Sequence, residues 1–321
     1  TRKESSAASD VYKRQDLYQD QAFKRGIFYS VISYVMWGTL PLYWTLIRGI
    51  DATETLMFRI VLSLIFMVIL IPLIGQQKQV YQDFSNLIAK PLKLFIIILA
   101  GYVVAVNWGT FIFAVNSGYV LQTSLGYYIN PLVSILLAMI FFKERFNRLE
   151  WLAILFAAIG VVYMTIKVGE FPVISLLLAF SFGIYGLLKK LVPMPAVSSI
   201  TIESLATAPM ALIYLIYLGQ TSGLSVGINM SSFWLLFSGA VTAIPLLAFS
   251  EGAIRIPLSL MGFIQYIGPT LIFILGIFVF KEPFNMDQFI TFCFIWTGIL
   301  IYVISQLLKM KRRPKPLEFQ E

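Results

Sequence analysis

Residues 128–131 of this chain read YINP, and residues 142–147 read FKERFN. Both stretches return 138 residues later, as YIGP at residues 266–269 and as FKEPFN at residues 280–285. Two sequence blocks that recur at one fixed spacing indicate an internal structural repeat. The chain is therefore expected to consist of two related halves.

The sequence around these blocks is too apolar for a soluble protein. Of the 321 residues, 59% are hydrophobic and only 12% are charged, about half the charged share of an ordinary soluble domain. This composition excludes a soluble enzyme, a disordered protein and a nucleic-acid binder, although the net charge is +8. The expected surroundings are a lipid bilayer.

Ten apolar runs are long enough to cross a bilayer, for which about 20 residues are needed. They are residues 26–46, 53–74, 92–115, 118–142, 149–168, 171–190, 199–219, 232–254, 257–280 and 286–308. The expected fold class is therefore an all-α integral membrane protein with ten transmembrane helices and short loops.

Each copy of the repeat holds five of these spans. Because five is an odd number, the second copy enters the membrane upside down, and we expect two inverted five-helix repeats, residues 24–168 and 171–308. Gly160 and Gly298 are also separated by 138 residues and so occupy equivalent positions in the two copies. Inverted repeats are typical of secondary transporters that alternate access around a site near the middle of the membrane.

The distribution of Lys and Arg predicts the orientation. With the N-terminus inside, the inner segments hold sixteen basic residues, and the outer segments hold Arg48, Lys167 and Lys281. Both termini of this multi-pass protein are therefore expected in the cytoplasm. The basic tail, residues 309–321, is expected to contact anionic lipid headgroups.

The first fifteen residues are set apart from the fold. Residues 10–15 read DVYKRQ, which resembles the translated end of a transposon adapter used in sequencing libraries. Residues 1–15 are therefore expected to be an assembly artefact, and the alternative is a disordered basic tail.

Composition and motifs also exclude several chemistries. The chain has no histidine and a single cysteine, Cys293, which excludes a Ser-His-Asp triad, a disulfide framework and a metal site built from Cys or His. No Walker motif is present, so ATP-driven transport within this chain is excluded. We expect no catalytic residue, no metal and no cofactor.

Three charged residues inside the spans are candidates for gating or coupling, because an ionisable group in hydrocarbon is costly unless it is paired or hydrated. Arg59 and Glu203 occupy equivalent positions of the repeat, so each is either a gate charge or a residue held by its own interface. A direct bridge between them is not favoured, because such positions approach opposite membrane faces. Glu251 lies four residues before Arg255, which favours a local ion pair over proton coupling.

Amides and aromatic rings within the spans are candidates for lining a substrate cavity, because a lipid-exposed amide forfeits its hydrogen bonds. These candidates are Trp37, Tyr43, Asn107, Trp108, Gln122, Asn130, Gln265 and Tyr266. The expected cavity lies among spans one, three, four, six, eight and nine. The alternative is helix packing, because small residues accompany the amides of span four at intervals of four.

Prolines within the spans mark expected helix breaks. Pro41, Pro131, Pro245 and Pro269 each remove one backbone hydrogen bond. Broken helices at related places in two halves are expected beside a transport site.

Several stretches resemble a known family. Residues 34–38, YVMWG, residues 126–133, GYYINPLV, and residues 265–271, QYIGPTL, are similar to the RarD permeases of the EamA family, in the drug/metabolite transporter superfamily. The resemblance covers nearly all of residues 24–308. It implies ten helices in two inverted repeats, a bacterial inner membrane location and a permease of poorly defined substrate. Glu251 is less typical of this family, and no shared role is carried onto it.

The sequence therefore predicts a secondary-active permease that moves a small organic solute, metabolite or drug by alternating access. Family analogy favours export, and an uptake permease or a non-coupled facilitator stays open as the alternative. Proton coupling would depend on Glu203 or Glu251. A channel is not favoured, since no selectivity filter is recognisable. An intramembrane enzyme is not favoured either, since no nucleophile–base pair lies at membrane depth.

Overall fold

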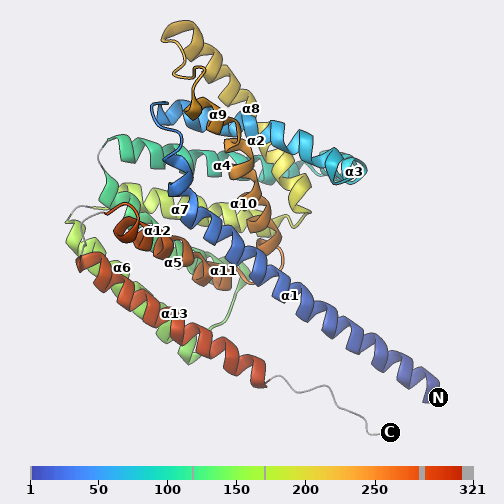
Figure 1. Ribbon diagram of the computed structural model, residues 1–321. Helices are drawn as coiled ribbons and strands as arrows, with labels where there is room; N and C mark the ends of the chain where they lie inside the picture. Colours follow the sequence, from blue (N-terminus) through green and yellow to red (C-terminus); the bar gives the residue numbers. More distant parts are fainter. Residues whose placement is uncertain (1, 118, 170, 282–285, 313–321) are drawn as a thin grey trace.

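The computed structural model describes residues 2–117, 119–169, 171–281 and 286–312, and these residues form thirteen helices with no strand (Figure 1). The helices are α1 Arg2–Trp44, α2 Ala52–Leu73, α3 Gln77–Ile88, α4 Pro91–Asn116, α5 Val120–Phe142, α6 Arg148–Val168, α7 Val173–Leu191, α8 Ala196–Thr221, α9 Met230–Leu236, α10 Ser238–Ala253, α11 Leu258–Gln265, α12 Ile267–Phe278 and α13 Met286–Arg312. The all-helical class is thus confirmed.

Nine helical segments of the described chain are long and apolar enough to cross a membrane. They correspond to nine of the ten expected spans, with α9 and α10 forming one segment and α11 and α12 another. The expected first span, residues 26–46, lies in α1, where Tyr, Trp and Ser residues dilute the apolar run. The protein is therefore a multi-pass membrane protein, and the count of ten stays a prediction.

Both chain ends were expected to lie outside the repeats. α1 begins at Arg2, and its helix includes residues 2–15. Their Ala, Lys and Glu residues are good helix formers. α13 ends at Arg312, and the rest of the expected basic tail lies outside the described residues.

The four prolines affect their helices differently. Pro41, Pro131 and Pro245 lie inside α1, α5 and α10, which continue through them. The segment that contains Pro269 divides at Tyr266 into α11 and α12. Pro269 has no N–H to donate to the carbonyl of Gln265, which is the last residue of α11.

Helix packing follows the two halves of the chain. α1 packs against α10 and α12, and α7 packs against α4 and α5. In the expected repeat, α1 is equivalent to α7, α4 to α10, and α5 to the segment formed by α11 and α12. The α1–α10 contact is therefore equivalent to the α7–α4 contact, and the α1–α12 contact to the α7–α5 contact. The pairs α2–α8, α5–α11 and α6–α13 each join equivalent segments.

Backbone details repeat at the offset of 138 residues. Lys143 and Lys281 both have positive φ angles, 52° and 57°. A Cβ on Gly160 would lie 2.9 Å from a carbonyl oxygen of α13, and one on Gly298 would lie 2.7 Å from a carbonyl oxygen of α6. The hydroxyl of Tyr266 donates to the carbonyl oxygen of its counterpart, Tyr128, at 3.3 Å. These matches support two inverted repeats, and superposition of the halves about a single axis stays a prediction.

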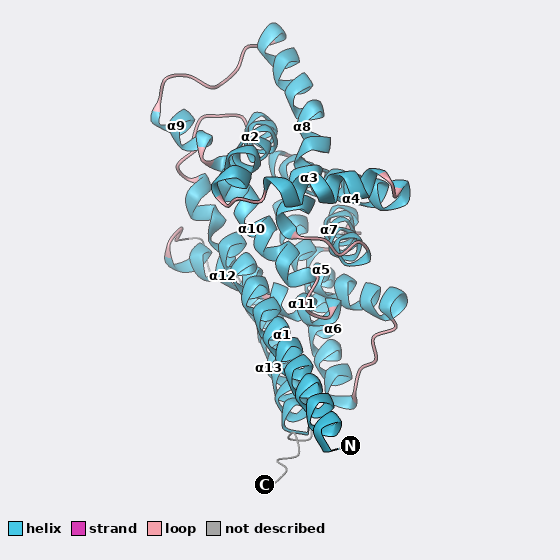
Figure 2. Cartoon of the chain, turned by 90° about the vertical axis from the view of Figure 1, so that its right-hand side faces the viewer, coloured by secondary structure: helices cyan, strands magenta, loops and turns pink. Residues whose placement is uncertain are grey.

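The start of α1 and the end of α13 lie at the same end of the molecule in both views (Figures 1 and 2). This placement agrees with an even number of spans. With the N-terminus inside, a reporter fused after Arg148 is expected to be active as a cytoplasmic fusion, and one fused after Thr221 as a periplasmic fusion. Paired phosphatase and fluorescent-protein fusions at both sites measure this, and the same location for both fusions would contradict the inverted repeat.

Candidate functional site

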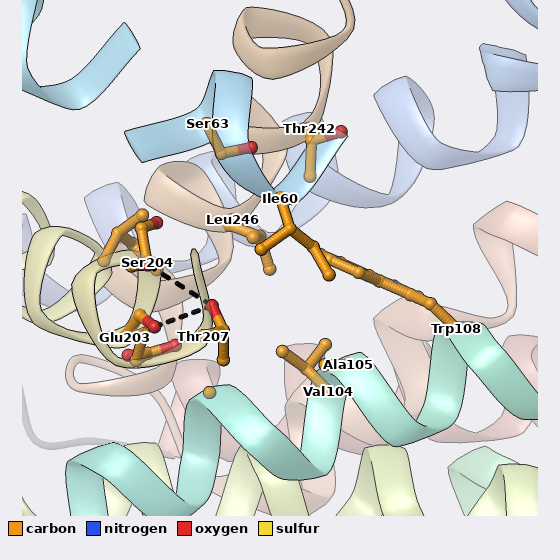
Figure 3. A pocket seen from close by; sticks show the side chains of 12 residues that line it. Ile60, Ser63, Val104, Ala105, Trp108, Glu203, Ser204, Thr207, Thr242 and Leu246 are labelled. Atoms are coloured by element: carbon orange, nitrogen blue, oxygen red, sulfur yellow. Dashed lines mark hydrogen bonds between the residues drawn. The ribbon is translucent and has the colours of Figure 1, made fainter. Parts of the chain in front are cut away.

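A cavity of about 30 Å³ lies among α2, α4, α8 and α10 (Figure 3). A space of this size admits about two water molecules. Its wall combines apolar side chains with the hydroxyls of Ser63, Ser204, Thr207 and Thr242 and the carboxylate-bearing Glu203. The cavity is therefore suited to hold water or part of a polar solute between the helices.

The α4 wall of the cavity follows from helical spacing. Gly101, Val104, Ala105 and Trp108 lie three or four residues apart and share one helix face. A Cβ on Gly101 would lie 3.0 Å from the carbonyl oxygen of Glu203, so the glycine allows α4 to approach α8 closely. Small residues at one end of the face and Trp108 at the other shape the cavity.

Glu203 lies on the cavity wall and is part of a buried polar network. Its carboxylate forms an ion pair with the ammonium group of Lys189 on α7. The hydroxyls of Ser199 and Tyr185 donate to the same carboxylate at 2.8 Å and 3.2 Å, and Lys189 also donates to Ser199 at 2.6 Å. Glu203 and Lys189 are only 4% and 5% exposed, so each depends on the other for charge compensation.

Arg59 approaches the cavity from α2. Its Nε donates to the hydroxyl of Thr242 at 3.0 Å. The guanidinium carbon lies 4.5 Å from the ring centroid of Trp44 and 4.9 Å from that of Trp108. Thr242 and Trp108 both line the cavity, and Figure 3 places them across it from Glu203. The two charges therefore lie on different sides of the cavity and form no bridge with each other.

Trp37 belongs to an aromatic cluster among α1, α7 and α10. Its ring centroid lies 5.4 Å from those of Tyr34 and Phe182 and 5.5 Å from that of Phe249. Tyr185 stacks on Phe249 at 5.3 Å. Because Tyr185 also donates to Glu203, the cluster adjoins the buried ion pair, although Trp37 does not line the cavity.

Two of the predicted amides connect packed helices. The amide nitrogen of Asn107 donates to the carbonyl oxygen of Leu178 at 2.9 Å and to the hydroxyl of Ser181 at 2.8 Å, both on α7. The side-chain oxygen of Gln122 accepts from the backbone N–H of Ile174 at 3.2 Å. Both sets of contacts agree with the packing alternative for these amides.

Other predicted residues also lie away from this cavity. The hydroxyl of Tyr43 donates to the carbonyl oxygen of Trp234 at 2.5 Å. Asn130 and Gln265 are buried, and Oδ1 of Asn130 has no hydrogen-bond partner within the described part of the chain. Tyr266 is fully buried against Tyr128. These residues belong to the contact region of the two halves.

Glu251 forms an ion pair with Arg255 and also accepts from the backbone N–H of Ala196 at 3.3 Å. The side chains of Glu251 and Arg255 are 25% and 29% exposed. Glu251 therefore has the local pair that its spacing favours, and it does not line the cavity.

The cavity differs in position from the expected one. It lies among spans two, three, seven and eight, and of the predicted residues Trp108 and Glu203 line it. The sequence analysis did not single out Lys189, Thr242 or Trp44. One available signal was position: Lys189 lies near the end of α7, fourteen residues before Glu203 on the next helix, α8.

The fold is a multi-pass bundle of helices with charged and hydroxyl side chains around a small cavity. The chain belongs to the EamA-like transporter family, whose family model matches residues 24–166. It is 42% identical to the uncharacterized transporter YojE of Bacillus subtilis, over 91% of this chain and 97% of that protein. It is 39% identical to protein RarD of Escherichia coli, over 91% of this chain and 98% of that protein.

A solved crystal structure shares the fold. It matches with a TM-score of 0.68 and 15% sequence identity, over 87% of this chain and 98% of that chain. The likeness at this identity concerns the arrangement of the helices alone.

Proposed function

We propose that the protein is a secondary-active transporter that moves a small organic solute across the bacterial inner membrane by alternating access. The observation that carries the proposal is the position of the cavity. Its four walls are α2 and α8, and α4 and α10, which are two pairs of equivalent helices in the repeat. A site between equivalent helices of two inverted repeats opens to one side or the other when the halves rock.

The two sides of the cavity carry different chemistry, which suits a gated site. Glu203, with its partner Lys189 behind it, lies on one side. Trp108 and Thr242, both in contact with Arg59, lie on the other. A rocking motion that separates α2 from α8 would hydrate one side at a time. Export is favoured over uptake by analogy with the family alone.

Proton coupling in this proposal depends on Glu203 rather than Glu251. Glu203 lines the cavity and pairs with a lysine that is also buried. Protonation of the carboxylate would release Lys189 from its partner and so change the charge beside the solute. Glu251 pairs with Arg255 and does not line the cavity.

Filling the cavity tests the proposal. Ala105 is 8% exposed and lines the cavity, whereas the next residue, Val106, is 54% exposed. In proteoliposomes, the Ala105→Leu variant is expected to lose at least about tenfold of solute counterflow, and Val106→Leu is expected to transport normally. Overpacking by three carbon atoms costs about 1–3 kcal/mol of stability, so the folded fraction of both variants is measured by gel filtration.

The assay uses a panel of labelled metabolites and antibiotics, with and without a proton gradient. Saturable counterflow with uphill accumulation driven by the gradient supports the coupled transporter. Saturable counterflow that no gradient can drive uphill identifies a non-coupled facilitator. Equal transport by Ala105→Leu and the unaltered protein would place the solute path elsewhere.

A further inference from the structure

Arg59 is a cation with unused hydrogen-bonding capacity inside the membrane-spanning region. It lies about two turns into α2. Among the described residues, only Nε of Arg59 has a hydrogen bond, to Thr242. In the part of the chain that the structure describes, no carboxylate lies within ion-pair distance of it, whereas Lys189 beside the same cavity has Glu203.

The contacts of Arg59 compensate its charge only in part. Its guanidinium lies over the rings of Trp44 and Trp108, and cation–π contacts of this kind favour a cation over uncharged neighbours. They do not use the terminal N–H donors, which are arranged as a planar fork that matches a carboxylate. Arg59 therefore combines free terminal N–H donors with two aromatic neighbours, one of which, Trp108, lines the cavity.

We propose that the transported solute carries a single carboxylate, which binds the terminal N–H groups of Arg59 while its apolar body lies against Trp44 and Trp108. This inference rests on the proposed transport function and specifies its substrate class. One uncompensated cation matches one negative charge, so a monocarboxylate fits better than a phosphate dianion, which would need further cations. Lys189 is not available for that purpose, because Glu203 already neutralises it.

The test measures binding before transport. Purified full-length protein in detergent is titrated with acetate, benzoate and phenylacetate, and with the corresponding uncharged amides, while tryptophan fluorescence and the thermal midpoint are followed. Saturable binding is expected for at least one carboxylate, with no comparable binding of its amide. Because each hydrogen bond to a charged group is worth about a tenfold step in affinity or more, Arg59→Gln is expected to weaken that binding by about tenfold or more.

Two further variants make the test specific. Arg48→Gln removes an exposed arginine of the loop before α2 and is expected to leave the affinity unchanged. Arg59→Lys keeps the charge and loses the planar fork, so its affinity is expected to lie between those of the unaltered protein and Arg59→Gln. Gel-filtration profiles and thermal midpoints without ligand establish that the variants are folded.

The outcomes separate this inference from the transport proposal. Equal binding of carboxylates and amides, no saturable binding of any carboxylate, or an unchanged affinity in Arg59→Gln would each overturn the inference. Transport of only uncharged or cationic solutes in proteoliposomes would overturn it and leave the transport function standing. Carboxylate binding through Arg59 without flux of any solute would support the anion site and count against the transport function.

Discussion

Replacing Lys189 by methionine is expected to destabilise the protein by about 3–5 kcal/mol, because the change leaves the buried carboxylate of Glu203 without its partner. Both side chains are almost completely buried, so water cannot replace the lost interaction. The thermal midpoint in detergent and the folded fraction after extraction measure the effect. Glu203→Leu alone is expected to destabilise the protein to a similar extent, since it leaves the ammonium group unpaired.

The double variant Lys189→Met/Glu203→Leu separates the ion pair from simple packing. Removing both charges together is expected to restore most of the stability, because neither group is then left unpaired. The exposed Lys93 is the control, and Lys93→Met is expected to be neutral within about 0.5 kcal/mol. If the double variant were as unstable as the sum of the two single variants, the pair would contribute no coupling energy.

The double variant also has a functional prediction. It retains the cavity but lacks the titratable pair, so it is expected to lose transport driven by a proton gradient while keeping counterflow. Gradient-driven accumulation at the unaltered rate would remove Glu203 from the coupling mechanism. The transport proposal itself would then depend on the cavity-filling result.

Replacing Gly239 by alanine is expected to disrupt the contact between α2 and α10. An added Cβ would lie 2.2 Å from the carbonyl oxygen of Leu62, and backbone atoms cannot move aside as a flexible side chain can. The free energy of unfolding of this variant is therefore expected to fall by about 3 kcal/mol or more. Measurement is by thermal unfolding and by expression of folded protein.

Two other glycines are matched controls for Gly239. Gly109 lies inside α4 with nothing within 4 Å of an added Cβ, so Gly109→Ala is expected to be neutral or to stabilise the helix by up to about 1 kcal/mol. Gly101 is the repeat counterpart of Gly239, and a Cβ added to it would lie 3.0 Å from the nearest backbone oxygen. The stability of Gly101→Ala is therefore expected to lie between those of the other two variants. Equal stability of all three variants would mean that α2 and α10 separate without cost.

The sequence was sufficient to predict the helical segments of the membrane fold. Runs of about 20 apolar residues can satisfy their backbone hydrogen bonds in lipid only as helices, so span positions follow from composition. The offset of 138 residues between the two repeats can be read directly from the matching sequence blocks. It recurs in the structure as the φ angles of Lys143 and Lys281 and as the contact between Tyr128 and Tyr266.

The candidate site was predictable only in part. An arginine and a glutamate inside apolar runs are rare and costly, which identified Arg59 and Glu203 before any contact was known. The amides were a weaker signal. An amide in a span is satisfied equally by a cavity or by a neighbouring helix, and the sequence cannot distinguish these two surroundings for Asn107 and Gln122.

Only the tertiary structure decided which residues share the cavity and which residues compensate its charges. The partner of Glu203 is Lys189 on α7, and Arg59 contacts Trp44 on α1, Trp108 on α4 and Thr242 on α10. These contacts depend on how each helix is rotated about its axis. In lipid that rotation is set by close packing at small residues and by buried polar contacts, because the apolar faces of a membrane helix are nearly equivalent to one another.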